Sequence, residues 1–402
     1  MLIKEILSER LQDFIRQLED EDPKTIVLKN KTIPGIPASF IADQVSGRKK
    51  AKEKIPDYSK NPFVVFPPQV NLEQSSSQVT AWFKSEFVRK NISACRNAAD
   101  LTGGLGVDTF FLSKIFHSID YVDPEPGILE IAKHNHEQLG ARNIRYHQRT
   151  AASFLDHSEE KFDFIFIDPS RRKEGNRKVN SLTQSEPDVV QLQNLILDRS
   201  GYCLIKASPL FDINVALKEL KHVRIVVVVS VKNECRELLF FQDAGFAGEP
   251  VVQAVNITSG NRIETFEFML SSERTIETEF SAPKKYLYEP NASILKAGAF
   301  KTISKTYKLS KVHPNTHLYT SDKLLKEFPG RIFSIESIVK SDPKTLEQFF
   351  PGGKANVLTR NYPLSVDELK KKLRLTDGDL KFLIGFTGID KKYLVVAERI
   401  NE

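Results

Sequence analysis

The chain has 402 residues, a length that fits two or three domains. Hydrophobic residues make up 40% and charged residues 27%, which excludes a globally disordered or collagen-like chain. Lys and Arg total 58 against 52 Asp and Glu, and the net charge of +6 permits a polyanionic partner without requiring one. The longest strongly apolar run, Ile225 to Val229, is too short to span a bilayer, and the N-terminus lacks a signal-peptide core.

The first 90 residues favour helices. Apolar residues such as Ile3, Ile6 and Leu11 recur at helical spacing among charged ones, and helical spacing returns at 72–90. Residues 46–70 carry many basic residues and end in prolines, so we expect an exposed connector there. The sequence therefore predicts a helical N-terminal segment with a basic connector over residues 1–90.

From Cys95 onward, short apolar runs alternate with amphipathic segments. Strands are expected at 95–101, 119–123, 143–148, 163–168, 202–206 and 223–231, with helices at 107–116, 126–139, 185–198 and 212–221. This alternation predicts βαβ units and a parallel sheet, hence an α/β domain. Residues 232–237 are too few for a crossover helix, so the apolar runs on either side of them predict an antiparallel hairpin that ends the sheet.

The pattern after residue 245 is mixed. Residues 251–257 and 263–269 flank a TSGN turn and read as strands. Residues 283–340 are rich in lysine, and 344–402 contain a charged helix at 365–373 and a final strand. We expect two small α+β modules, at 246–340 and 341–402, after a catalytic domain at 91–245.

A glycine-rich turn follows the first strand, in NAADLTGGLGVDTFFL. The strand ends at Asp100, the turn holds Gly103, Gly104 and Gly106, and Asp108 opens a helix. Glycines let a ligand approach the backbone, and a carboxylate at the end of a strand suits an ammonium group. The turn lacks the third glycine of GxGxxG and any lysine or arginine for a phosphate, which argues against a dinucleotide oxidoreductase.

Asp123 ends the second strand, about twenty residues after the glycine turn. An acid at this position can accept hydrogen bonds from both hydroxyls of a ribose. Glu125 is a nearby competitor, and a cap for the helix that starts near Pro126 is the alternative role for Asp123.

The segments ADLTGGLG, DYVDPEP and DFIFIDPSRR resemble motifs I, II and IV of the class I S-adenosylmethionine-dependent methyltransferases. The resemblance spans about residues 95–242 and implies a Rossmann-like sheet of seven strands. YLYEPNASILKAGAF at 286–300 and the segment from 344 onward resemble a bacterial group with C-terminal ferredoxin-like and THUMP-like modules. Members of this group are regarded as RNA methyltransferases.

The resemblance implies roles for individual residues. The residues of the glycine-rich turn would bind the methionine end of S-adenosylmethionine, and Asp123 would bind its ribose. The residues of the turn are Asp100, Thr102, Gly103, Gly104, Gly106 and Asp108. Thr150 stands where an adenine-binding aspartate is usual, so we expect its hydroxyl or backbone groups to select adenine.

Asp168 follows an apolar strand at the carboxyl edge of the sheet, where open α/β sheets carry their chemistry. Methyltransferases that act on amines use a similar place for Asp/Asn-Pro-Pro-aromatic, in which the acid orients the target amine and the aromatic ring stacks on the base. This chain keeps Asp168 and Pro169 but has Ser170 and Arg171, so stacking would fall to the guanidinium of Arg171. The alternative is that Asp168 only caps the loop.

Basic residues adjoin this predicted reaction centre. Arg171, Arg172 and Lys173 open a basic loop that suits an RNA phosphate backbone, and Lys206 follows at the end of the fifth strand. A solvated surface is the alternative for all of them. Residues 284–311 carry seven lysines among aromatic residues, which fits either an RNA-facing surface or an ordinary exterior.

Together these features predict a cytoplasmic S-adenosylmethionine-dependent methyltransferase that modifies a base nitrogen of rRNA or tRNA. Three scattered cysteines favour a reducing compartment. The cysteines and histidines show no metal-site spacing, so no metal is expected. No membrane is expected either, because the apolar runs are short. The alternatives are a methyltransferase for a protein or small molecule, and a non-catalytic RNA-binding protein with a vestigial cofactor fold. The oligomeric state stays open.

Overall fold

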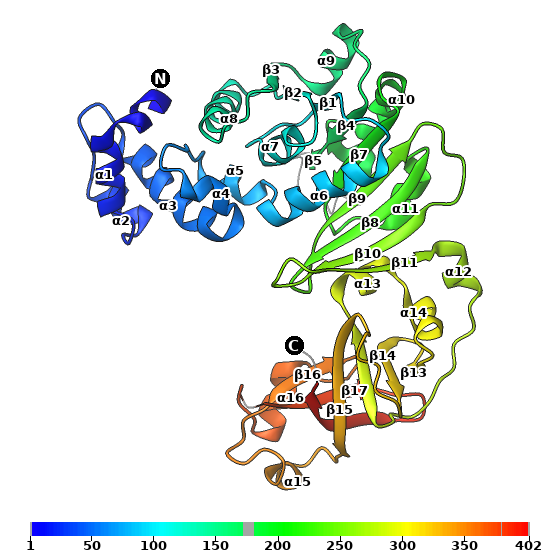
Figure 1. The fold of residues 1–402 in the computed structure, drawn as a ribbon. Coiled ribbons are helices and arrows are strands. Elements are labelled where there is room, and N and C mark those ends of the chain that lie inside the picture. The colour runs from blue at the N-terminus through cyan, green and yellow to red at the C-terminus, as the bar shows by residue number, and fades with distance from the viewer. Residues whose placement is uncertain (1, 172–180, 379, 401–402) are drawn as a thin grey trace. The chain divides into compact units, whose positions relative to one another are not determined.

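The computed structural model describes residues 2–171, 181–378 and 380–400 (Figure 1). The chain forms two compact units. The first comprises Met1–Arg224 and Leu238–Gly248, and the second comprises Ile225–Glu237 and Glu249–Glu402. Among the described residues, no helix is long and apolar enough to cross a membrane.

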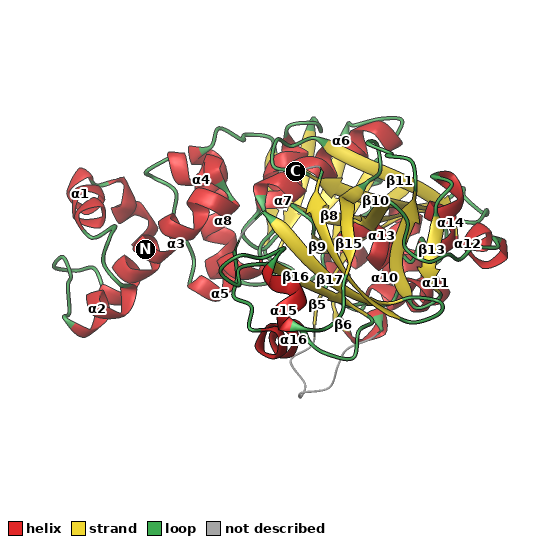
Figure 2. Ribbon diagram, turned by 90° about the horizontal axis from the view of Figure 1, so that it is seen from below, coloured by secondary structure: helices red, strands yellow, loops and turns green. Residues whose placement is uncertain are grey.

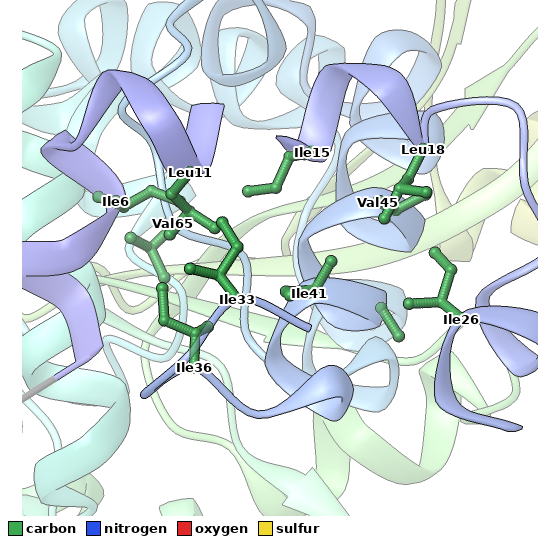
Figure 3. Close-up of a cluster of buried hydrophobic side chains, with 11 residues drawn as sticks. Ile6, Leu11, Ile15, Leu18, Ile26, Ile33, Ile36, Ile41, Val45 and Val65 are labelled. Atoms are coloured by element: carbon green, nitrogen blue, oxygen red, sulfur yellow. The ribbon is translucent and has the colours of Figure 1, made fainter. Parts of the chain in front are cut away.

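The N-terminal segment of the first unit consists of helices and loops, as expected (Figure 2). Its elements are the 3₁₀ helix η1 (Leu2–Leu7), α1 (Glu9–Gln17), α2 (Pro23–Leu28), α3 (Ala38–Lys54), α4 (Pro56–Lys60), α5 (Gln69–Gln74) and α6 (Gln78–Asn91). One hydrophobic cluster joins Leu11 and Ile15 of α1, Ile26 of α2 and Val45 of α3 (Figure 3). A second cluster joins this segment to the start of α7 (Val107–Ser113).

The expected exposed connector at 46–70 is wrong for most of its length. α3 continues to Lys54, because the buried residues Ile41, Val45, Arg48 and Ala51 recur at intervals of three or four residues along one face while lysines occupy the other. Arg48 lies on the buried face and its guanidinium donates to the backbone oxygen of Pro62 at 2.8 Å. Most of the basic residues of this stretch therefore lie on the outer face of a helix. The number of charged residues alone does not distinguish such a helix from an exposed loop.

The larger sheet has nine strands in the order β11-β10-β8-β9-β7-β4-β1-β2-β3. Their bounds are β1 (Asn97–Asp100), β2 (Ser118–Val122), β3 (Ile144–His147), β4 (Phe164–Ile167), β7 (Tyr202–Ala207), β8 (Val223–Val231), β9 (Glu234–Asp243), β10 (Val251–Ile257) and β11 (Ile263–Met269). β3, β2, β1, β4 and β7 pair in parallel, and β9 pairs antiparallel with β7. The α/β class and the parallel sheet are confirmed.

The expected count of seven strands is not confirmed. In the second unit, β10 pairs in parallel with β8, and β11 returns antiparallel to β10 across the predicted TSGN turn. β10 covers the edge of the valine-rich β8, which would otherwise expose unpaired backbone groups. Two strands expected in a separate module therefore extend the sheet.

Helices connect the parallel strands of the first unit. They are α7, α8 (Pro126–Gln138), α9 (Ala151–His157), α10 (Val189–Arg199) and α11 (Ile213–Glu219), with the short elements β5 (Ser170–Arg171), the 3₁₀ helix η2 (Leu182–Gln184) and β6 (Ser185–Glu186) between β4 and α10. The register pairs Asp100 with Tyr121 of β2 and Phe166 of β4, so the carboxyl ends of β1, β2 and β4 lie at one edge. That edge positions the candidate site.

A second sheet of seven strands runs in the order β13-β14-β12-β15-β18-β17-β16. The strands are β12 (Tyr286–Pro290), β13 (Ser310–His313), β14 (Thr316–Ser321), β15 (Gly330–Ile338), β16 (Asn356–Arg360), β17 (Lys381–Thr387) and β18 (Lys392–Arg399). The helices of this unit are α12 (Leu270–Thr275), α13 (Ala292–Ala297), α14 (Phe300–Thr306), α15 (Pro343–Glu347) and α16 (Val366–Leu373). The expected α+β character, charged helix and final strand are confirmed.

Glu289 of β12 is a buried carboxylate in this second sheet, with 3% of its surface exposed. It accepts hydrogen bonds from Arg331 of β15 and from Arg360 at the end of β16. β12 and β16 are not neighbours in the strand order, so this carboxylate joins two parts of the sheet that backbone pairing leaves apart.

Candidate functional site

The glycine turn between β1 and α7 is a tight backbone loop. The Gly103 N–H donates to the Val122 carbonyl at 2.9 Å, and a Cβ at Gly103 would lie 2.1 Å from the Tyr121 ring. Gly106 has a φ of +78°, in the left-handed region, and a Cβ there would lie 2.4 Å from His136 Nε2. Glycine is therefore required at both positions by close approach, and at Gly106 also by backbone conformation.

The carbonyl groups of this turn are held by buried aromatic side chains. The Tyr121 hydroxyl donates to the Gly104 carbonyl at 2.5 Å, and His136 Nε2 lies 2.8 Å from the Gly106 carbonyl. Burial lowers the pKa of His136 to about 4, so the ring is neutral at physiological pH. Because a carbonyl only accepts, Nε2 carries the proton, and Nδ1 accepts from the Tyr146 hydroxyl at 3.0 Å.

His136 is a residue that sequence reasoning missed. It belongs to the HNH run of α8, and a histidine on a helix carries no signal of what it contacts. Only its fully buried position and the close approach to Gly106 reveal its role in supporting the turn.

Asp100 is buried at the end of β1, with 1% of its surface exposed. Its carboxylate accepts hydrogen bonds from the Thr109 hydroxyl at 2.6 Å and from the Thr102 N–H at 3.1 Å. Burial raises the pKa of Asp100 to about 7; the Thr109 hydrogen bond opposes that rise, whereas the nearby Asp108 adds to it. The ionised form of such a buried carboxylate is stabilised when a cation binds beside it.

Asp123 is half-buried just beyond β2. One carboxylate oxygen accepts from the Gly104 N–H at 2.9 Å and the other from the Glu125 N–H at 2.9 Å. Burial raises the pKa of Asp123, and the two backbone hydrogen bonds oppose that rise. Asp123 is therefore joined to the glycine turn, and α8 begins after Glu125 without a side-chain cap from it.

Thr150 is exposed and caps α9, because its hydroxyl accepts from the Ser153 N–H at 3.2 Å. The helix that it caps was not expected from the sequence.

Asp108 lies in the first turn of α7 and is nearly buried. Its carboxylate accepts from the Ser76 hydroxyl at 2.6 Å and lies 3.1 Å from Lys84 Nζ of α6. The side chain of Lys84 is only 2% exposed. The helical N-terminal segment thus contacts the residue that follows the glycine turn.

Asp168 lies at the carboxyl end of β4. Its N–H donates to the Thr102 hydroxyl oxygen at 2.7 Å, which ties the loop after β4 to the glycine turn. Its carboxylate forms an ion pair with Lys206 of β7. The register pairs Ile167 with Ile205, so the two charged residues face each other at the next position along both strands. The structure therefore brings together Asp100, Thr102, Asp123, Asp168 and Lys206 at one edge of the sheet.

The loop after Asp168 is described only at its start. Pro169 is followed by β5, where Ser170 and Arg171 pair with β6, and the Ser170 hydroxyl donates to the Glu186 carbonyl at 3.3 Å. Arg172 and Lys173 lie outside the described residues. Among the described residues, no group of three or more His, Cys, Asp or Glu side chains could hold a metal ion.

One of the seven lysines at 284–311 departs from the expected surface reading. Lys311 is 4% exposed, its ammonium donates to the Pro314 carbonyl at 2.6 Å, and burial lowers its pKa to about 8. It does not offer its charge to a partner at the surface.

Comparisons with known proteins identify the family. A family model described as a ferredoxin-like domain matches residues 286–329, and one described as THUMP domain-like matches 330–399. A crystal structure of a "putative methyltransferase" from Porphyromonas gingivalis W83 is similar over 99% of both chains, with a TM-score of 0.85 and 31% identity. The chain belongs to the class I S-adenosylmethionine-dependent methyltransferases. Within them it falls in the group with C-terminal ferredoxin-like and THUMP-like domains, and its cofactor is S-adenosylmethionine.

Other solved structures resemble part of this methyltransferase. An rRNA methylase from Streptococcus thermophilus is 16% identical with a TM-score of 0.31, over 40% of this chain and 93% of that chain. A Streptococcus mutans protein in complex with S-adenosylhomocysteine (SAH) is 18% identical with a TM-score of 0.31, over 40% of this chain and 94% of that chain. No curated protein matches the chain. The ferredoxin-like and THUMP-like matches share one sheet, since β12 of the first pairs with β15 of the second.

Proposed function

We propose that this methyltransferase modifies a base nitrogen of RNA, either rRNA or tRNA, in the cytoplasm. The observation that carries the proposal is the position of Asp168, which is tied to Thr102 of the glycine turn and paired with Lys206. A carboxylate so close to the cofactor loop can hold an amine beside the methyl donor. Proximity and alignment supply most of the rate enhancement for a good nucleophile.

The residues of the turn fit S-adenosylmethionine. Asp100 is the buried acid for the ammonium group of the methionine end, and Asp123 accepts from the ribose hydroxyls. Gly103, Gly104 and Gly106 bring the backbone close to the cofactor, with Thr102 and Asp108 beside them, and Thr150 faces the adenine. When bound, the cofactor supplies an electrophilic methyl group.

Asp168 acts on the acceptor. Its carboxylate accepts an N–H of the target amine, turns the nitrogen lone pair toward the methyl group and stabilises the positive charge that develops on nitrogen. It then receives the proton that the methylated nitrogen releases. Lys206 fixes the orientation of this carboxylate and donates a hydrogen bond to a neighbouring acceptor on the base. Pro169 and Ser170 shape the loop.

RNA binding is assigned to basic groups around this centre and to the C-terminal part of the chain. Arg171, Arg172 and Lys173 come soon after Asp168 in the chain, and we assign to them contacts with phosphates or stacking on the base. The THUMP domain-like match at 330–399 supports an RNA role for the second unit. We propose residues 91–245 as the methyl-transfer domain and the chain after residue 245 as the part that holds RNA.

The test is Asp168→Ala, with Asp156→Ala as the matched control, because Asp156 is an exposed aspartate of the same unit. Asp168→Ala should abolish methyl transfer while leaving the SAH affinity, measured by calorimetry, within about threefold of wild type. Asp156→Ala should match wild type in both assays. Full activity in Asp168→Ala would remove this residue from the mechanism.

One observation favours a second candidate. Arg171 stands where a base-stacking aromatic residue is usual, so a protein or small-molecule acceptor is the alternative. Methyl label that appears in the protein or small-molecule fraction, and not in RNA, would support it.

A further inference from the structure

Lys84 is a buried cation that the proposed reaction does not use. It belongs to α6, which precedes the sheet in the chain, and its side chain is 2% exposed. Its ammonium lies 3.1 Å from one oxygen of Asp108 and donates to the Ser76 hydroxyl at 3.3 Å. Ser76 in turn donates to the other oxygen of Asp108 at 2.6 Å. The three groups contact one another, and burying a charge in this way is costly unless the charge is paired.

The cluster reaches the cofactor site through consecutive residues of α7. Asp108 contacts Lys84 and Ser76, and the next residue, Thr109, donates to Asp100. The first turn of α7 is thus fixed on one side to α6 and on the other to β1. A change at Lys84 would act on Asp100 through two adjacent residues.

Two carboxylates act on Asp100, and each is paired with a lysine. The carboxylates of Asp108 and Asp168 both act to raise the pKa of Asp100. Each of them is paired with a lysine from another element, Asp108 with Lys84 and Asp168 with Lys206. Tyr121 also packs beside this group, and burial keeps its pKa far above neutral, so its phenol is uncharged.

We infer that Lys84 is a positioning residue of the cofactor site, acting through Asp108 on Asp100. The inference rests on the proposed role of Asp100 as the partner of the cofactor's ammonium group. Without Lys84, the buried Asp108 charge is uncompensated, and the ionised form of Asp100 becomes less favourable. The helical N-terminal segment is therefore part of the catalytic unit, because its Lys84 supplies the positive charge that favours the ionised form of Asp100.

The experiment measures SAH affinity by calorimetry from pH 5.5 to 8 for wild type and Lys84→Met. Lys90→Met, at the exposed end of the same helix, is the matched control. The pH below which binding weakens should move up by about one unit in Lys84→Met, an affinity loss of about tenfold on the acid side. Lys90→Met should leave the profile unchanged. In an Asp108→Asn background, Lys84→Met should cause no further shift, because the charge it compensates is gone.

An unchanged profile in Lys84→Met, or an affinity lowered equally at every pH, would overturn the inference. If Lys84→Met does not fold, Ser76→Ala removes one hydrogen bond to Asp108 and should cause a smaller upward shift, and no shift would again overturn it. Absence of SAH binding to the wild type at every pH would contradict the proposed cofactor role instead.

Discussion

Substitution of Gly106 by alanine tests the glycine turn most sharply. The new Cβ would lie 2.4 Å from Nε2 and 2.5 Å from Cε1 of a fully buried His136, where an ordinary contact needs at least 3.4 Å. The turn must therefore move by about 1 Å. Overpacking a buried site costs about 1–3 kcal/mol, and the left-handed backbone adds about 1–2 kcal/mol.

Gly140→Ala separates these two contributions. Gly140 has a φ of +82°, close to that of Gly106, but a Cβ there would meet nothing within 4 Å. It follows α8, the helix that carries His136, so both changes fall in the same unit. We expect Gly140→Ala to lose only the backbone contribution of about 1–2 kcal/mol.

The assay is thermal unfolding together with SAH calorimetry. The relevant transition is the one whose midpoint SAH raises, because a ligand stabilises the unit that binds it. Gly106→Ala should lower this midpoint more than Gly140→Ala does, and should weaken SAH binding by at least about tenfold, since a 1 Å displacement of a binding loop is costly. Equal SAH affinity in the two variants would refute the assignment of this turn to the cofactor.

Three further predictions concern Asp100 and His136 at the candidate site, and Glu289 in the second unit. SAH affinity should fall by about tenfold per pH unit below pH 7, because the pKa of Asp100 is about 7 and only its ionised form pairs with an ammonium group; a flat profile from pH 5.5 to 8 would exclude Asp100 as that partner. His136→Phe removes a hydrogen bond to the Gly106 carbonyl and should weaken SAH binding by about three- to tenfold. The shape of the pH profile should not change, because His136 has a pKa of about 4 and stays neutral from pH 5.5 to 8. A changed shape would show that the ring carries charge. Glu289→Gln leaves Arg331 and Arg360 without their carboxylate and should lower the free energy of unfolding of the second unit, measured in urea, by about 2–3 kcal/mol. This loss is smaller than for a fully buried pair because both guanidinium groups are partly exposed. An unchanged urea midpoint would contradict the role of Glu289 in joining the sheet.

The parallel sheet was predictable because its strands carry their own signal. Apolar runs separated by amphipathic helices imply that the carboxyl ends of the strands meet at one edge, and the register indeed places Asp100 beside Tyr121 and Phe166. Asp100 and Asp123 could be selected for this reason. They lie close together because parallel strands place their carboxyl ends at the same edge of the sheet, and the alternation of strands and helices in the sequence predicts this arrangement.

Contacts between distant segments were not predictable. Nothing near Lys84 indicates that it pairs with Asp108, and nothing near Lys206 indicates that it pairs with Asp168, because both pairs depend on packing between elements. The basic run at 46–60 was misread because exposed lysines on a helix and lysines in a loop have the same composition. α9, the helix that Thr150 caps, was not expected from the sequence.

The central claim is methyl transfer to RNA, and the most direct measurement uses total RNA from a strain that lacks this protein. Purified wild type and Asp168→Ala are incubated with this RNA and S-adenosylmethionine carrying a tritiated methyl group, and the RNA is digested to nucleosides for analysis. We predict label in one nucleoside, on a base nitrogen, with the wild type and none with Asp168→Ala. Absence of label in RNA, with SAH binding verified for the same preparation, would contradict the claim.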